Sequence, residues 1–341
     1  HWSYGKEKGI SNFIYQDRKS DLFICIISPW GGSLGDLSSY KSILTEVMFG
    51  GKRLKVRELV KSTTEISIED VMKDQKVPAV GIAIYNNYNL AWKKNYGIKN
   101  SQNQNKVTER TLFRAGSLSK TAIAFTVAQL MEQGILHPYE NWNQKLRKYK
   151  ISLKQKKKGE FVNLDQLLSH TSGLTEKGNW DDPINKGKKH ISEIKDTFSE
   201  KPGHGLELYY SPGSKSRYSG GGYAVIQEAL TNSLGKNFPL LIETYVSKPL
   251  HWKESTFRQN LASPIDYCDG HDMDGNVLLQ KNFITPELGS GGLWTTPEEI
   301  GNLFNEVAKA YNGNSEFISP SYAKYLLTPK MSAANLTVHA L

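Results

Sequence analysis

The sequence contains few cysteines and no long hydrophobic run, and each absence excludes a class of protein. Cys25 and Cys268 are the only cysteines among 341 residues, too few for a disulfide framework or a cysteine-based metal site. We expect both to be buried free thiols. The longest apolar run, Leu22–Ile27, is far shorter than the roughly 18 residues that a membrane-spanning helix needs. The sequence therefore predicts no transmembrane segment in this stretch.

The positive charge lacks the features that accompany nucleic-acid binding. The formal net charge is +9, and much of it lies in two basic segments, Lys52–Lys61 and Lys145–Lys158. No zinc-ligand spacing and no interleaving of aromatic with basic residues supports nucleic acid as a partner. The second segment is better explained as a solvated loop.

The pattern of apolar residues predicts a mixture of strands and helices. Two apolar runs at 13–16 and 22–28 indicate a hairpin, and residues 77–97 indicate another that turns at Asn86 and Asn87. Residues 117–134 form a predicted helix that is apolar nearly all round, which is typical of a buried helix. Further helices are predicted at residues 36–50, 67–75, 164–169, 222–230, 240–245 and 296–311.

Ser117, in the stretch RAGSLSKTAIAF, is the strongest candidate for a nucleophile. Lys120 follows three residues later on the same face of the predicted helix, so its amine can reach the hydroxyl. A lysine in apolar surroundings loses basicity through desolvation and can take the serine proton. The S-x-x-K pattern occurs at five other places in this chain. The glycine before Ser117 and the apolar helix after it distinguish this occurrence from the others.

Tyr218 and His170 are two further candidates. Tyr218 lies between a Pro-Gly turn and a run of three glycines, in PGSKSRYSGGGY. A tyrosine beside a buried lysine can act as a general base or relay a proton, although a packing tyrosine before a glycine-rich helix start is the ordinary explanation of such a pattern. For His170, in LLSHTSGL, we expect a hydrogen-bonded structural role. A Ser-His-Asp triad is not supported, because none of the eight histidines stands in a supporting motif.

The ordered motifs SLSK, LLSHTSGL, PGSKSRYSGGGY and GSGGLWTTPEEIGNLF resemble those of the serine β-lactamase-like hydrolases. This superfamily includes class C β-lactamases, D-Ala-D-Ala carboxypeptidases and related esterases. The resemblance runs from about residue 67 to residue 330. It implies an α/β (α+β) fold of the β-lactamase/transpeptidase type, with an antiparallel sheet flanked by helices and a mostly helical subdomain.

The resemblance also implies roles for individual residues. Ser117 would be the acylated nucleophile, Lys120 its proton partner and Tyr218 the base of a Y-x-N element. The third position of that element is Gly220 here, although Asn is the family residue that helps to hold a substrate amide. This departure weakens the case for a peptide or β-lactam substrate and favours an ester.

The predicted function is that of a serine hydrolase that forms an acyl-enzyme on an ester, amide or β-lactam carbonyl. No metal or organic cofactor is implied, and the expected partner is a small-molecule or peptidoglycan-like substrate. The resemblance further implies export to the periplasm or beyond. Two alternatives stay open: a penicillin-binding sensor that is acylated without turnover, and an inactive scaffold of the same fold.

The N-terminal residues resemble a part of the family that the rest of the sequence lacks. Family members carry a K-T-G or H-x-G strand after the other motifs, and no such strand follows residue 330. The stretch SYGKEKGIS at residues 3–11 resembles it, with Gly5 and Gly9 at the glycine positions and Ser3 where Lys or His is usual. The backbone N–H of Lys6 would then complete an oxyanion hole with that of Ser117.

We therefore expect three segments. Residues 1–50 would be the C-terminal part of a β-lactamase-like domain, with the third-motif strand, a hairpin and a closing helix. Residues 51–66 would be a basic connector, and residues 67–341 the N-terminal and helical parts. A circularly permuted domain and a piece of a tandem array both fit this order, and an unrelated N-terminal extension is the alternative. The permuted order predicts that Gly5 and Lys6 face Ser117.

Overall fold

The computed structural model describes residues 2–7, 10–17, 22–31, 67–151, 160–175, 182–183, 194–199, 205–259, 261, 265–278, 283–333 and 336–338. The predicted helix at 36–50 and the basic connector at 51–66 lie outside these residues. The chain forms two compact units. Unit 1 consists of residues 1–116, 262–281 and 295–301, and unit 2 consists of residues 117–261, 282–294 and 302–341.

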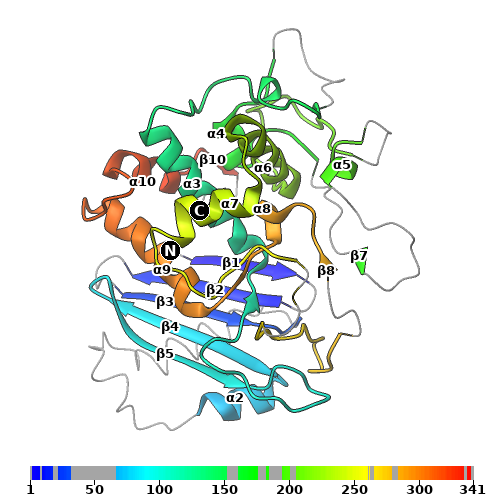
Figure 1. Ribbon diagram of the computed structural model, residues 1–341, viewed down its shortest axis with the longest axis vertical. Helices are drawn as coiled ribbons and strands as arrows, with labels where there is room; N and C mark the ends of the chain where they lie inside the picture. Colours follow the sequence, from blue (N-terminus) through cyan, green and yellow to red (C-terminus); the bar gives the residue numbers. More distant parts are fainter. Residues whose placement is uncertain are drawn as a thin grey trace. The chain divides into compact units, whose positions relative to one another are not determined.

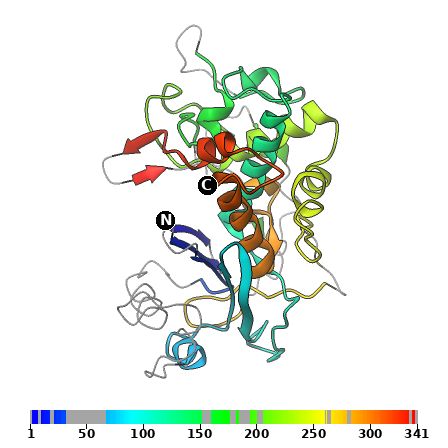
Figure 2. The same ribbon diagram turned by 90° about the vertical axis from the view of Figure 1, so that its left-hand side faces the viewer.

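Unit 1 is built on one antiparallel sheet of five strands, which lie in chain order (Figure 1). The strands are β1 (Trp2–Glu7), β2 (Ile10–Asp17), β3 (Leu22–Ser28), β4 (Ala79–Asn86) and β5 (Asn89–Gly97). Figure 2 shows the N-terminal strands, in blue, beside β4 and β5, in cyan. The strands predicted within 13–16, 22–28 and 77–97 are confirmed, and β1, β2 and β3 belong to the same sheet as β4 and β5.

The pairing of β3 with β4 joins the N-terminal strands to the rest of the sheet. Cys25 lies opposite Ala83, and Leu22 lies opposite Asn86. All seven residues of β3 are buried, which is the pattern of a central strand covered on both faces. The turn between β4 and β5 lies one residue later than predicted. Asn87 and Tyr88 both have positive φ, 47° and 62°, as the two central residues of a type I′ turn require.

One face of this sheet packs into an apolar cluster with helix α2 (Ile68–Asp74). Ser67 caps α2 by accepting a hydrogen bond from Asp70 N–H, which satisfies one of the free amides of the first turn. Other members of the cluster come from strands β2, β3, β4 and β5: Phe13, Leu22, Ile24, Ile26, Val80, Ile82 and Tyr96.

The first turn of helix α9 (Pro297–Tyr311) also contacts this sheet. The Tyr85 hydroxyl donates to the Glu298 carbonyl at 2.6 Å. A Cβ atom on Gly301 would lie 2.8 Å from the Tyr85 ring, so a glycine is needed for the close approach.

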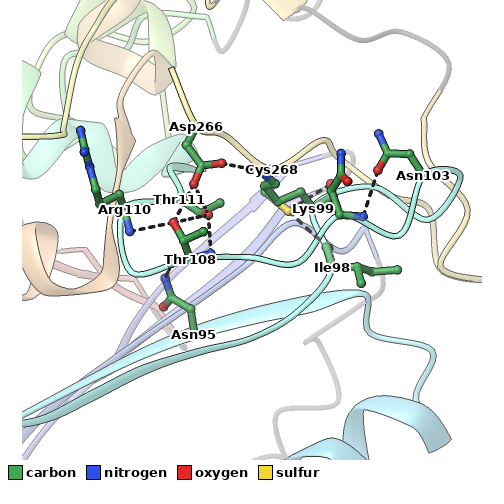
Figure 3. Close-up of polar contacts among 10 residues, drawn as sticks. Asn95, Ile98, Lys99, Asn103, Thr108, Arg110, Thr111, Asp266 and Cys268 are labelled. Atoms are coloured by element: carbon green, nitrogen blue, oxygen red, sulfur yellow. Dashed lines mark hydrogen bonds and ion pairs between the residues drawn. The ribbon is translucent and has the colours of Figure 1, made fainter. Parts of the chain in front are cut away.

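A polar network joins residues 266–269 to the segment that follows β5 (Figure 3). The Asp266 carboxylate accepts hydrogen bonds from Lys99 Nζ at 2.8 Å and from the hydroxyls of Thr108 and Thr111 at 2.7 and 2.8 Å. Burial acts to raise the pKa of Asp266, but these hydrogen bonds outweigh it and hold the pKa below its usual value. The backbone of Cys268 pairs with that of Leu112 at 2.9 Å.

Unit 2 is mostly helical, and its central helix is α3 (Ser119–Glu132), whose residues from Ser119 to Met131 are all buried. This confirms the predicted buried helix, although its first turn, η1 (Gly116–Leu118), is a 3₁₀ turn. Helices α6, α7, α8 and α10 contact α3. The other helices and turns are η2 (Trp142–Gln144), α4 (Leu164–Leu168), α5 (Ile194–Thr197), α6 (Gly220–Leu234), α7 (Phe238–Ile242), the π-helical η3 (Glu243–Ser247), α8 (Leu288–Gly291) and α10 (Pro320–Leu327).

The short strands complete the described elements, and the fold is of the β-lactamase/transpeptidase type predicted from the sequence. They are β6 (Phe113–Arg114), β7 (Asp182–Pro183), β8 (Phe283–Ile284), β9 (Trp294–Thr295), β10 (Met331–Ala333) and β11 (Leu336–Val338). Cys25 and Cys268 are buried free thiols, as predicted. Within the described ranges, no helix is both long and apolar enough to cross a membrane.

Substitution of Ile24 tests whether the N-terminal strands are part of the core. Ile24 is 2% exposed, so Ile24→Ala leaves a cavity and should lower the free energy of unfolding by about 2–5 kcal/mol. Leu90→Ala on β5 is the control, because Leu90 is 38% exposed. Urea unfolding measures both variants. Equal stabilities for the two would contradict a central position for β3.

Substitution of Asp266 tests the polar network. Because the pKa of this carboxyl is lowered by folding, its ionised form stabilises the protein above about pH 4, and the contribution is lost as the pH falls below that value. Asp266→Asn should therefore cost about 1–3 kcal/mol at pH 7 and progressively less in acid. Asp274→Asn, which removes an exposed pair with Lys76, is the control and should change stability little. A cost for Asp266→Asn that does not vary with pH would refute this account.

Candidate active site

Three residues predicted from the sequence lie together in unit 2. The Ser117 Oγ lies 2.6 Å from the Tyr218 hydroxyl and 3.2 Å from Lys120 Nζ, which donates to it. The Tyr218 side chain is 40% exposed, whereas Lys120 is 6% exposed. The serine hydroxyl thus contacts a phenol that is open to solvent and an ammonium group that is buried.

Ser117 owes its position to the tight turn before α3. Gly116 has a φ of 52°, a conformation that glycine adopts without strain. The 3₁₀ turn η1 then leads directly into α3. Lys120 follows Ser117 by one helical turn, so both side chains lie on one face, as the spacing predicts.

Lys120 is fixed by the backbone of helix α8. Its Nζ donates to the Ser290 carbonyl at 2.6 Å. Gly289 permits this approach, because a Cβ atom there would overlap the Ile123 side chain of α3. The Gly289 N–H in turn donates to Gln227 Oε1 of α6 at 2.8 Å. Ser290 was not predicted from the sequence. The glycines of GSGG around it indicate that two backbones come close there.

Tyr218 is held through its two neighbours in the sequence. Arg217 N–H donates to the His170 carbonyl at 2.8 Å, and Ser219 N–H donates to His170 Nδ1 at 3.1 Å. Ser219 also caps α6, since its hydroxyl accepts from Gly222 N–H at 3.0 Å. The backbone on both sides of the phenol is therefore anchored.

His170 lies against Tyr218. The centroids of the two rings are 4.4 Å apart, and the His170 ring is 5.4 Å from that of Tyr223. Burial, and then the charge on Lys120, lower the pKa of His170 to about 3. The imidazole is therefore neutral near pH 7, with its proton on Nε2, because Nδ1 is an acceptor. The predicted hydrogen bond is present, but the sequence analysis missed the contact with Tyr218.

The ammonium of Lys120 is the charge that dominates this site. Its Nζ lies 5.0 Å from the centroid of the Tyr218 ring and 5.5 Å from that of Tyr223, within the range of cation–π attraction. Burial, and then the charge of Tyr218, raise the pKa of Tyr223, whose hydroxyl donates to the Leu168 carbonyl at 3.1 Å. A neutral histidine and a neutral tyrosine thus flank the catalytic candidates.

Gly220 is the first residue of α6 and offers no side chain to a substrate amide. Ser3, Gly5 and Lys6 lie on β1, opposite Ile14, Asn12 and Ser11 of β2. They belong to unit 1 and Ser117 to unit 2, so the expectation that Gly5 and Lys6 face Ser117 stays a prediction. Across the residues that the structure describes, no group of three or more His, Cys, Asp or Glu residues is placed to hold a metal ion.

Two relatives of this chain, both from Staphylococcus aureus, illustrate what it is similar to. Protein flp of Staphylococcus aureus (strain MRSA252) is 23% identical over 230 residues, which cover 67% of this chain and 44% of flp. The teichoic acid D-alanine hydrolase of Staphylococcus aureus is 26% identical over 232 residues, which cover 66% of this chain and 53% of that protein. This chain thus spans about half the length of the curated relatives that it matches.

Comparison with solved structures supports the fold. EstCE1, a hydrolase with promiscuous acyltransferase activity, matches with a TM-score of 0.64 at 16% identity, over 77% of this chain and 75% of that chain. A model of the Beta-lactamase family matches residues 66–335, a span that contains Ser117, Lys120 and Tyr218. The chain therefore belongs to the Beta-lactamase family.

Proposed function

We propose that this chain is a serine hydrolase that cleaves an ester through an acyl-enzyme at Ser117. The observation that carries the proposal is the pair of short contacts at the Ser117 Oγ, 2.6 Å to Tyr218 and 3.2 Å to Lys120. A nucleophile needs a group that removes its proton within hydrogen-bond reach. An inactive scaffold of the same fold would not require a buried ammonium group beside this serine.

The proposed reaction has two halves. The Ser117 Oγ forms a bond to the ester carbonyl carbon as its proton passes to the Tyr218 oxygen, with Tyr218 acting as a phenolate beside the Lys120 ammonium. The resulting tetrahedral intermediate breaks its bond to the alcohol oxygen, which leaves with that proton. Water then repeats these steps on the acyl-enzyme, releases the acid and restores the Ser117 hydroxyl.

An ester is the preferred substrate for two reasons. Gly220 at the start of α6 removes the side chain that would hold an amide in the family's Y-x-N element. Two of the similar proteins are a teichoic acid D-alanine hydrolase and the hydrolase EstCE1. We propose an acyl ester on a wall-associated polymer or a small molecule as the substrate, and on that basis a periplasmic or secreted location.

We further propose that residues 1–50 are the C-terminal part of the same domain. The support is the continuity of the sheet, in which β3 pairs with β4. In addition, the buried Asn12 of β2 donates to the carbonyls of Arg114 and Ala115 at 3.3 and 2.8 Å, within the segment that leads to Gly116. Strands of an unrelated extension would have no reason to make these contacts.

Substitution of Ser117 tests the nucleophile. Ser117→Ala should lower kcat/KM for p-nitrophenyl acetate by at least about 10³-fold, and Tyr218→Phe by about 10²–10⁴-fold. The matched control is Ser321→Ala, because Ser321 and Lys324 repeat the S-x-x-K pattern on the exposed start of α10. Ester hydrolysis that persists in Ser117→Ala would rule out the proposed nucleophile. A stable adduct on Ser117 without turnover would instead favour the penicillin-binding sensor.

Substitution of Gly220 tests the preference for esters. Gly220→Asn restores the amide side chain of the Y-x-N element, so acylation by a chromogenic β-lactam should rise about tenfold relative to the ester, the effect of one added hydrogen bond. Gly222→Ala is the control, because a Cβ there would make only ordinary contacts of 3.6–3.7 Å. An unchanged ratio of the two rates in Gly220→Asn would show that Gly220 does not set the preference.

A further inference from the structure

We propose that His170 is a positioning residue, which holds the phenol of Tyr218 against the Ser117 hydroxyl through ring packing and two backbone anchors. The inference rests on the proposed function, since it assigns a role in the same reaction. Among the described residues, no hydrogen bond joins His170 to Ser117, so its effect would pass through Tyr218.

The first support is that His170 contacts three consecutive residues. Its carbonyl accepts from Arg217 N–H, its Nδ1 accepts from Ser219 N–H, and its ring packs on Tyr218 between them. The ring centroids are 4.4 Å apart with planes inclined by 32°. One side chain and its backbone thus fix the position of the phenol and the direction of the backbone that carries it.

The second support is the backbone conformation of His170 itself. The residue follows α4 in the left-handed region, with a φ of 56°. His170 N–H pairs with the Leu167 carbonyl and Thr171 N–H with the Gln166 carbonyl, which is the Schellman pattern of a helix end. Glycine is the residue that this position favours, and a histidine there is strained. Helix termination alone therefore does not explain the imidazole.

The third support is the charge state of the pocket. The titratable groups that face His170 are Lys120 of α3, Tyr218 just before α6, and Tyr223 of α6. With a pKa near 3, the imidazole stays neutral at working pH and adds no second cation beside Lys120. It can therefore pack closely on Tyr218 without adding a positive charge beside the phenolate.

The test uses two substitutions that the backbone tolerates. His170→Gly relieves the left-handed strain but removes the ring and the Nδ1 acceptor. His170→Asn also tolerates this conformation and keeps an acceptor for Ser219 N–H. We expect His170→Gly to lower kcat for p-nitrophenyl acetate about 10–100-fold with KM little changed and folding stability retained. His170→Asn should recover part of the loss.

A double-mutant cycle shows whether the effect passes through Tyr218. In a Tyr218→Phe background, His170→Gly should lower kcat by less than about threefold, because the hydroxyl that it positions is already absent. His137→Asn is the matched control, since His137 is an exposed histidine of unit 2 that packs on Tyr139 with ring centroids 6.4 Å apart. It should leave kcat unchanged.

Three results would overturn the proposal. These are a kcat of His170→Gly within threefold of the wild type, the same loss in both backgrounds of the cycle, and a loss that vanishes when rates are divided by the folded fraction. If the wild type hydrolyses no ester, the proposed function fails and the ¹³Cζ NMR resonance of Tyr218 decides the positioning role. That resonance should shift in His170→Gly and stay in place in His137→Asn, and no shift in either variant would refute the role.

Discussion

The burial of one ammonium group, that of Lys120, is the constraint on which the candidate site depends. A buried cation costs several kcal/mol unless acceptors meet its hydrogen-bonding groups. Here the Ser290 carbonyl and the Ser117 hydroxyl meet it, at 2.6 and 3.2 Å. One of these acceptors is a backbone carbonyl and another is the proposed nucleophile. The hydrogen bond to Ser117 therefore both stabilises the buried ammonium group and places its charge beside the serine hydroxyl.

The packing and charge of unit 2 follow from this contact. The Ser290 carbonyl reaches Lys120 where α8 lies directly on α3, and there a Cβ atom on Gly289 would overlap the Ile123 side chain. Burial, and then repulsion by the charge on Lys120, keep the neighbouring imidazole of His170 neutral. Close packing of neutral rings on Tyr218 then becomes possible.

The sequence predicted the parts of the site that local spacing decides. Ser117 and Lys120 lie one helical turn apart, and a one-turn separation has a fixed geometry. Tyr218 was found through the order of the motifs. Ser290 was missed because it acts through its carbonyl, which any residue possesses. The contact of His170 with Tyr218 was missed because it depends on how two distant segments pack, which periodicity does not encode. The type I′ turn after β4 was predicted one residue too early, because Asn86, Asn87 and Tyr88 offer alternative positions for it.

In the sheet of unit 1, the pairing of the strands matters more than their order along the chain. An antiparallel ladder is held by hydrogen bonds between neighbours and by the side chains that each face buries, and neither depends on which strand was synthesised first. Strand β3 is buried at all seven positions and pairs with β2 on one side and with β4 on the other. Removing it would divide the sheet in two, so residues 22–28 are part of the core of unit 1 rather than an attachment to it. The physical requirement therefore falls on the β3–β4 ladder instead of on chain order.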